Sequence, residues 1–173
     1  MSVGSIRLLA NILKKISSDE YSAKIANNIA DTMSGKKALV KTRSDFFKYL
    51  KNNDVLDIEI DAPKGSLKGF GGKKRPVPFD YGEVKGAINP SDNMGWDVIF
   101  PPSEETDVKQ LVPIGFVEIN PDKSVWREMG GKLPPIGNDK IIVSGVGSIS
   151  ADDKDIISSF FNDMWQFKEI VWL

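Results

Sequence analysis

The chain has 173 residues, of which 40% are hydrophobic and 27% charged, a composition typical of a soluble domain with one core and at most a small appendage. Its net charge of −1 conceals an asymmetry: residues 1–53 hold ten Lys/Arg and four Asp/Glu, whereas residues 54–173 hold thirteen and twenty. The chain contains no cysteine and no histidine, which excludes disulfides, thiol nucleophiles, zinc thiolate sites and Ser-His-Asp catalysis. Any catalysis would use carboxylates, lysine, arginine and tyrosine, with Mg²⁺ or Mn²⁺.

Apolar residues recur every three or four positions in the first third of the chain, which predicts three helices. The first carries the stripe Ile6, Leu9, Ile12, Leu13 and Ile16. The second is capped at Ser17 or Ser18, is stopped by Gly35, and carries Tyr21, Ile25, Ile29 and Met33. The third begins at a Ser44 cap and carries Phe46, Phe47 and Leu50. These stripes either pack on one another and on the body or form a docking face for another chain.

From Asp54 the hydrophobic period changes to two, which predicts strands. Residues 55–61 form a half-buried strand with an acidic outer face, and residues 64–78 form a loop or strained hairpin. Further strands are expected at 81–88, 96–100, 111–119, 124–127, 140–146 and 169–173. A helix follows Ser150, its N-cap.

This pattern predicts an α+β protein. Residues 54–173 would form a small, mostly antiparallel, OB-like β-barrel with one C-terminal helix. Residues 1–53 would form a basic helical N-terminal arm. No apolar run is long enough to span a bilayer, and the N-terminus lacks the features of a signal peptide, so we expect a cytoplasmic (host-cell interior) or virion protein.

An Asp-containing turn, residues 92–97, leads directly into an apolar strand that ends in Pro-Pro. Carboxylates on a tight turn at the mouth of a sheet can gather oxygen ligands around Mg²⁺. Asp92 and Asp97 are therefore either metal ligands or solvated turn residues. Met94 lies between them and cannot serve as a ligand for a hard cation.

The order of motifs resembles that of the soluble family I inorganic pyrophosphatases, and more closely the shortened pyrophosphatase-like domains in polyvalent proteins of phages and conjugative elements. The resemblance covers about residues 54–173. The motifs, in chain order, are Asp57-Ile-Glu-Ile, Pro63-Lys-Gly-Ser-Leu-Lys68, Lys73-Lys-Arg75, Asp80-Tyr81-Gly82, Asp92-x4-Asp97, Pro113-Ile-Gly-Phe-Val, Gly137-Asn-Asp-Lys140 and Phe160-Phe161.

In that family a five-stranded barrel surrounds several Mg²⁺ ions, and basic residues and tyrosine hold the phosphates. The resemblance implies a metal-binding set made up of Glu59, Asp92, Asp97 and Asp139. It implies a phosphate-binding set made up of Lys68, Arg75, Tyr81 and Lys140. The lysines and arginine of this set, with Lys73 and Lys74, form either an anion cradle or simply a hydrated surface.

The sequence departs from the family at the positions that matter most for chemistry. Met94 replaces the central Asp, Phe70 replaces a Glu, and Asn138 falls on a metal-binding Asp unless Asp139 takes that role. Such losses typically lower an enzyme's rate by several powers of ten. We therefore expect no required cofactor, although weak Mg²⁺ binding is compatible with the remaining carboxylates.

Three functions follow from this pattern. The first is a non-catalytic phage or mobile-element structural or interaction protein, which uses the barrel as a scaffold and the basic arm to bind virion subunits, host proteins or nucleic acid. The second is a Mg²⁺-dependent phosphoanhydride hydrolase that uses Asp92, Asp97 and Asp139. The third is a protein that sequesters a phosphorylated ligand without cleaving it. An oligomer is compatible with each, and no membrane partner is expected.

Overall fold

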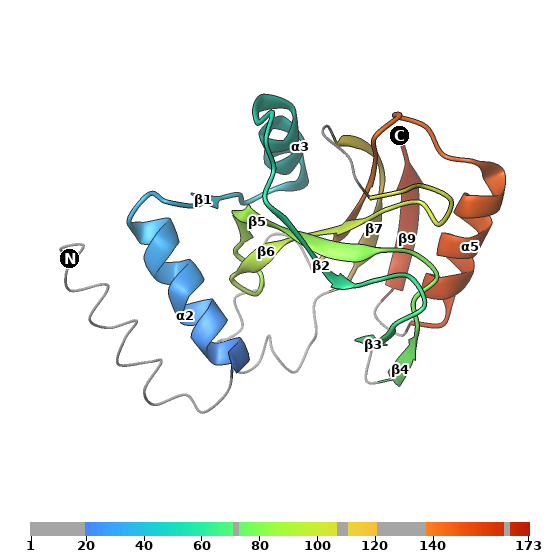
Figure 1. The fold of residues 1–173 in the computed structure, drawn as a ribbon, viewed down its shortest axis with the longest axis horizontal. Coiled ribbons are helices and arrows are strands. Elements are labelled where there is room, and N and C mark those ends of the chain that lie inside the picture. The colour runs from blue at the N-terminus through green and yellow to red at the C-terminus, as the bar shows by residue number, and fades with distance from the viewer. Residues whose placement is uncertain (1–19, 71–72, 107–110, 121–137, 165–166) are drawn as a thin grey trace.

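The computed structural model describes residues 20–70, 73–106, 111–120, 138–164 and 167–173. These residues form an α+β fold, as the sequence predicted, with a large sheet, a separate hairpin and three described helices (Figure 1). The helices are α2 (Glu20–Met33), α3 (Arg43–Asn52) and α5 (Ala151–Asn162). The strands are β1 (Ala38–Leu39), β2 (Ile58–Ala62), β3 (Leu67–Phe70), β4 (Lys73–Pro76), β5 (Tyr81–Asn89), β6 (Met94–Ile99), β7 (Val112–Ile119), β8 (Lys140–Ser144) and β9 (Phe167–Trp172).

The large sheet has the strand order β1-β5-β6-β8-β7-β9, and β2 also pairs with β5. Most pairs are antiparallel, whereas β1–β5 and β6–β8 are parallel. A register shift between Val84 and Ile88 divides β5, so that β2 pairs with its first half and β1 with its second. Among the described strands the sheet is open, because the order ends at β1 on one side and at β9 on the other, and these two strands do not pair. The closed OB-like barrel is therefore not confirmed.

Two apolar cores lie against the sheet. One is formed with α5, where Phe79 packs against both Phe160 and Phe161. The other is formed with α3, where the rings of Phe46 and Trp96 stack with centroids 4.8 Å apart. Residues 38–52 thus share a core with the sheet, while the domain boundary expected at residue 53 stays a prediction.

The caps of two helices were predicted from single polar residues. Ser150 caps α5 as expected, because its hydroxyl accepts a hydrogen bond from the Asp153 amide. The cap of α3 is Thr42 instead of Ser44. Thr42 has extended backbone angles, and its Oγ1 accepts from the Asp45 amide at 3.1 Å. The helix therefore starts two residues earlier than a Ser44 cap would place it.

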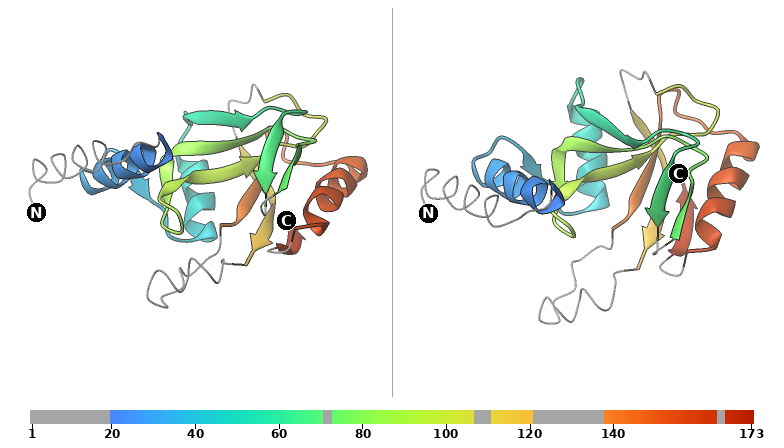
Figure 2. Two further views of the ribbon diagram at one scale, coloured as in Figure 1. Left: turned by 90° about the horizontal axis from the view of Figure 1, so that it is seen from below. Right: turned by 60° about the horizontal axis from the view of Figure 1, so that its bottom comes forward.

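Helix α2 is present where predicted, but its apolar stripe does not face the sheet. Tyr21, Ile29 and Met33 are 54%, 38% and 53% exposed, and the buried residues are Ala26, Asn28 and Ala30. The helix lies beside the β5–β6 end of the sheet, far from α5 (Figures 1 and 2). Among the described residues, α2 contacts the body through small and polar side chains. Whether its apolar stripe packs on residues 6–16 or on another chain stays a prediction, because residues 6–16 lie outside the described part of the chain.

Two predicted elements, the helix at residues 6–16 and the strand at 124–127, lie outside the described residues. The segment 64–78, expected to be a loop or strained hairpin, contains the hairpin β3–β4. Among the described helices, none combines the length and apolar character that crossing a membrane requires.

Candidate functional site

A cleft of about 770 Å³ opens where α2, the β3–β4 hairpin and strands β2, β5 and β6 meet. Its lining is mostly charged, with carboxylates and lysines from segments far apart in the sequence. Six of the eight predicted site residues line it: Glu59, Lys68, Tyr81, Asp92, Asp97 and Lys140. The other described residues that line it are Glu20, Tyr21, Lys24, Asp61, Gly69, Glu83, Met94, Ile119, Asn138 and Met164.

Sheet register aligns the central carboxylates. Glu59 of β2 lies opposite Glu83 of β5, and Glu83 lies opposite Asp97 of β6. Directly paired residues project to the same face of a sheet, so these three carboxylates form one row. Lys140 of β8 extends the row through its ion pair with Asp97. Four strands thus contribute one charged side chain each to the floor of the cleft.

Like charges directly opposite one another destabilise a sheet, so the Glu59–Glu83 pair requires compensation. Lys24 of α2 supplies it, with its ammonium group paired to Glu83 and 3.7 Å from Glu59. Burial lowers the pKa of Lys24, but the hydrogen bond and charge of Glu83, with the charges of Asp61 and Glu59, outweigh burial and raise it above 10.5. Lys85 adds a second cation, 3.0 Å from Glu59.

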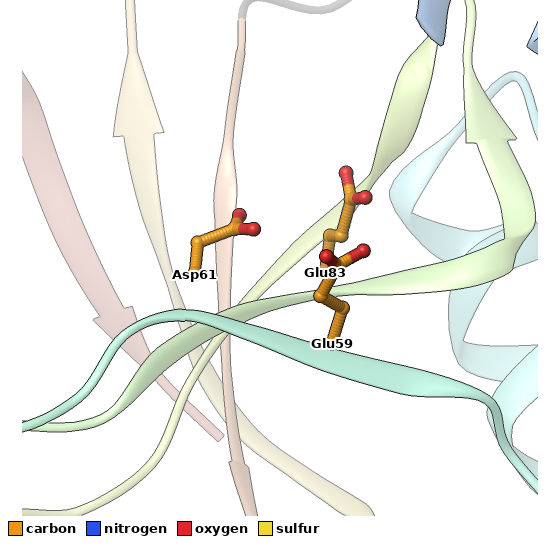
Figure 3. Close-up of side chains that lie close together, drawn as sticks. All are labelled: Glu59, Asp61 and Glu83. Atoms are coloured by element: carbon orange, nitrogen blue, oxygen red, sulfur yellow. The ribbon is translucent and has the colours of Figure 1, made fainter.

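A third acidic group lies beside this pair. Carboxylate oxygens of Glu59, Asp61 and Glu83 all lie within 4.8 Å of one another, on the same face of β2 and β5 (Figure 3). Lys68 of β3 approaches Asp61 at 3.7 Å and lies 3.9 Å above the ring of Tyr81. Burial is the main cause that lowers the pKa of Lys68.

Tyr81 and the Asp97–Lys140 pair form the deep side of the cleft. The tyrosine is almost fully buried. Burial, together with the charge of Asp97 and a hydrogen bond to it, raises the pKa of Tyr81 well above its usual value. The phenol therefore stays neutral at physiological pH and can act only as a hydrogen-bonding group.

The Asp92 turn closes one end of the cleft. Asp92 Oδ1 accepts a hydrogen bond from the Met94 amide at 2.9 Å, and Asn93 adopts φ = 59°. Burial, opposed by this hydrogen bond, raises the pKa of Asp92 from 3.8 to about 6. Met94 lines the cleft, and Asn28 of α2 approaches it, with Nδ2 3.9 Å from the sulfur. The thioether therefore lies between Asp92 and α2.

Two predicted site residues lie outside the cleft. Asp139 is buried, accepts a hydrogen bond from the Ile119 amide at 3.0 Å and lies 3.6 Å from Arg43. Its neighbour Asn138 lines the cleft instead. Arg75 pairs with Asp163 at 3.6 Å on the α5 side. Neither side chain belongs to the described lining of the cleft.

Sequence reasoning missed three contributors to the site, namely Lys24, Asp61 and Glu83. The signal for Glu83 was its position two residues after Tyr81, because alternate residues of a strand share a face. Asp61 bears the same relation to Glu59. Lys24 gave no signal, because only tertiary packing brings α2 to this cleft.

The donor set does not fit a centre for several divalent cations. Asp97 is engaged by Lys140 and Glu83 by Lys24. Asp139 accepts a hydrogen bond from the Ile119 amide and does not line the cleft. Met94, with its thioether, occupies the position in the turn where a metal centre of this kind would require a third carboxylate. The side chain of Phe70 lies outside the described part of the chain. Ammonium groups of the chain thus pair with four of the six described carboxylates that line the cleft, namely Glu59, Asp61, Glu83 and Asp97.

Comparisons with known proteins add no relative to this description. The chain matches no protein-family model, no curated protein and no solved structure. The likeness to inorganic pyrophosphatases therefore rests on the motifs of the sequence and on the positions of their residues. It stays a prediction.

Proposed function

We propose that this chain is a non-catalytic interaction protein of a phage or mobile element, built on a degenerate pyrophosphatase-like scaffold of OB-like ancestry. The observation that carries the proposal is the pairing of cleft carboxylates with lysines of the same chain. Lys140 engages Asp97, Lys24 engages Glu83, and both carboxylates belong to the row across the sheet.

Metal-assisted phosphoryl chemistry requires carboxylates that are free to coordinate several cations and lower the pKa of a water molecule. A cation would have to displace Lys140 from Asp97, where both side chains are largely buried and well matched in charge. It would also meet the sulfur of Met94, which hard cations do not accept as a ligand. The cleft therefore favours a structural role over catalysis.

The binding surface in this proposal is the basic N-terminal part of the chain. Lys36 and Lys48 are 60% and 72% exposed, and Lys41 and Lys51 are exposed as well. Such a surface suits an acidic partner, either a nucleic acid or an acidic face of a virion subunit. Exposed apolar residues of α2 lie beside it.

Two assays test the proposal with the purified full chain. Phosphate release from pyrophosphate and nucleotides with Mg²⁺ or Mn²⁺ should stay at background. Fluorescence anisotropy with labelled single- and double-stranded nucleic acids should show salt-dependent binding that K48E/K51E weakens. Alternatively, a pull-down with virion proteins should show retention that the same variant loses. Turnover that D97A abolishes would overturn the proposal, as would an inert monomer that binds neither class of partner.

The second candidate is a Mg²⁺-dependent phosphoanhydride hydrolase. One observation favours it: six residues chosen from pyrophosphatase-like motifs meet in a single cleft. The phosphate-release assay decides between the two functions, with D97A as the site-specific control and D54N, at an exposed position, as its matched comparison. Calorimetry with pyrophosphate and nucleotides tests the third function, sequestration without cleavage.

A further inference from the structure

Helix α2 contacts the body through a small, polar side. Its buried residues are Ala26, Asn28 and Ala30, whereas α3 buries Phe46 and Leu50. Burial of large apolar side chains is the main source of packing free energy, so α3 is firmly fixed and α2 is not. Of the large apolar residues of α2, Tyr21, Ile29 and Met33 are exposed and Ile25 is only partly buried, so they contribute less than the buried side chains of α3.

Charged and amide groups make the specific contacts of α2. Lys24 pairs with Glu83 and Glu59. Asn28 donates a hydrogen bond to the Asn93 carbonyl at 2.9 Å and accepts one from Lys37 at 2.8 Å. Interactions of this kind are more easily exchanged for water than apolar contacts are.

The interface between α2 and the strands is also incompletely packed. A second cavity, of about 260 Å³, lies between α2 and strands β2, β5 and β6. Its lining is polar and includes Lys24, Asn27, Asn28, Asp31 and Glu83. This cavity is partly open to solvent, so water can reach the polar contacts between α2 and the strands.

The chain leaves α2 through a short connection that can act as a hinge. Gly35 has φ = +76°, and no atom lies within 4 Å of the position a Cβ would occupy. The next anchoring points are β1, with two residues paired to β5, and then the well-packed α3. The amides of residues 34–37 donate hydrogen bonds to the carbonyls of Ala30, Asp31 and Thr32, so these residues would move with α2. Rotation at their junction with β1 would leave the rest of the sheet and α3 undisturbed.

We propose that α2 is a releasable strap over the charged cleft, held closed by Lys24 on Glu83 and Glu59, and that it opens while the sheet and α3 stay folded. Opening would expose the Glu59–Glu83 pair and the Met94 turn, so the strap would control access to the cleft. This device does not depend on whether the cleft binds, catalyses or does neither.

The absence of native cysteine permits a direct test. A26C places one thiol beneath α2, where Ala26 is buried, and V98C places one in the core of β6. The rate of thiol labelling of A26C reports release of the strap, and that of V98C reports opening of the core. A26C should be labelled at least about tenfold faster than V98C, because local opening requires less free energy than global unfolding.

Adding K24A or raising the salt concentration should increase the A26C labelling rate about tenfold further, because the contacts of Lys24 with Glu83 and Glu59 are lost when the strap opens. K36A is the matched control, because it removes an exposed lysine from the same region without touching the cleft. Equal labelling rates at the two sites would overturn the proposal. So would the absence of a K24A effect on A26C labelling.

Hydrogen exchange of the unmodified chain provides a second measurement if a cysteine variant fails to fold. Amides of residues 24–33 should exchange faster than those of residues 47–52, and K24A should accelerate exchange of the first group. Exchange of both helices at the same rate would show that α2 opens only with global unfolding and would refute the strap.

Discussion

Lys140 of β8 and Asp97 of β6 form an ion pair across two parallel strands, with side chains only 7% and 13% exposed. The pair lies beside the buried ring of Tyr81 and ends the row of carboxylates that crosses the sheet. Removing one partner would leave the other charge uncompensated in a poorly hydrated site. This makes the pair a structural element of the cleft, whatever the cleft binds.

A double-mutant cycle tests that role. K140M and D97N should each lower the free energy of unfolding by about 3 kcal/mol, because each leaves a buried group without its partner. The K140M/D97N double variant should lose much less unfolding free energy than the sum of the losses of the two single variants. Urea denaturation followed by tryptophan fluorescence measures all three.

K85M is the comparison for this cycle, because Lys85 pairs with Glu59 where both side chains are more than a third exposed. K85M should lower the free energy of unfolding by less than about 1 kcal/mol. Additive losses in the Lys140–Asp97 cycle would show that the two side chains do not stabilise one another.

Asp92 should make stability depend on pH. Burial raises the pKa of its carboxyl from 3.8 to about 6, so the folded state holds this proton more tightly than the unfolded chain. Stability contributed by the proton is therefore lost as the pH rises from about 4 to about 6. Three charged side chains, Asp97, Lys140 and Glu83, act on the Asp92 carboxyl.

D92N keeps the oxygen that accepts from the Met94 amide and removes the charge. At pH 7 it should be more stable than the wild type by about 2 kcal/mol, and at pH 4 the difference should nearly vanish. Thermal or urea unfolding across this range measures the difference. D54N, at an exposed carboxylate, controls for overall charge. A D92N advantage that is equal at both pH values would contradict the burial argument.

Local patterns were sufficient to predict most elements of the fold. A three-to-four-residue apolar period predicted α2, α3 and α5, and apolar–polar alternation predicted β2 and β5–β8. Both patterns can be recognised from residues that are close together in the sequence. The side of α2 that meets the sheet could not be predicted in this way. An apolar stripe shows which side could be buried, but only tertiary packing decides whether a partner surface lies opposite it. Closure of a barrel is likewise decided by long-range pairing.

The sequence predicted those site residues that belong to recognisable motifs. Six residues placed by the pyrophosphatase-like pattern do meet, because β2, β5 and β6 are neighbours in the sheet. Lys24 could not be predicted, because no local rule connects a helix of the arm to Glu83. Asp139 was expected in the cleft, but the Ile119 amide and Arg43 hold it elsewhere.

The cap of α3 offers a sharp local test. T42A should destabilise the chain by about 1 kcal/mol, because the Asp45 amide loses its acceptor. S44A should change stability by less than about 0.5 kcal/mol, because Ser44 lies within the exposed first turn. Urea denaturation of both variants compares the two positions. A larger loss for S44A would restore the serine as the cap.

Met94 is the substitution on which the non-catalytic proposal depends most. M94D would place a third carboxylate between Asp92 and Asp97, close to the buried Glu83. Without divalent cations the added charge should lower the melting temperature, because like charges gather in a partly buried site. Mg²⁺ should recover that loss, since cations that bind only the folded state stabilise it.

Thermal unfolding with and without MgCl₂ measures the effect. M94N is the matched control, because it introduces a polar side chain of the same size as aspartate without the charge. Wild type and M94N should show no specific gain from Mg²⁺ beyond that produced by equal ionic strength of NaCl. If the wild type gains as much as M94D, the remaining carboxylates already bind the cation despite Lys24 and Lys140, and the hydrolase becomes the better explanation of the cleft.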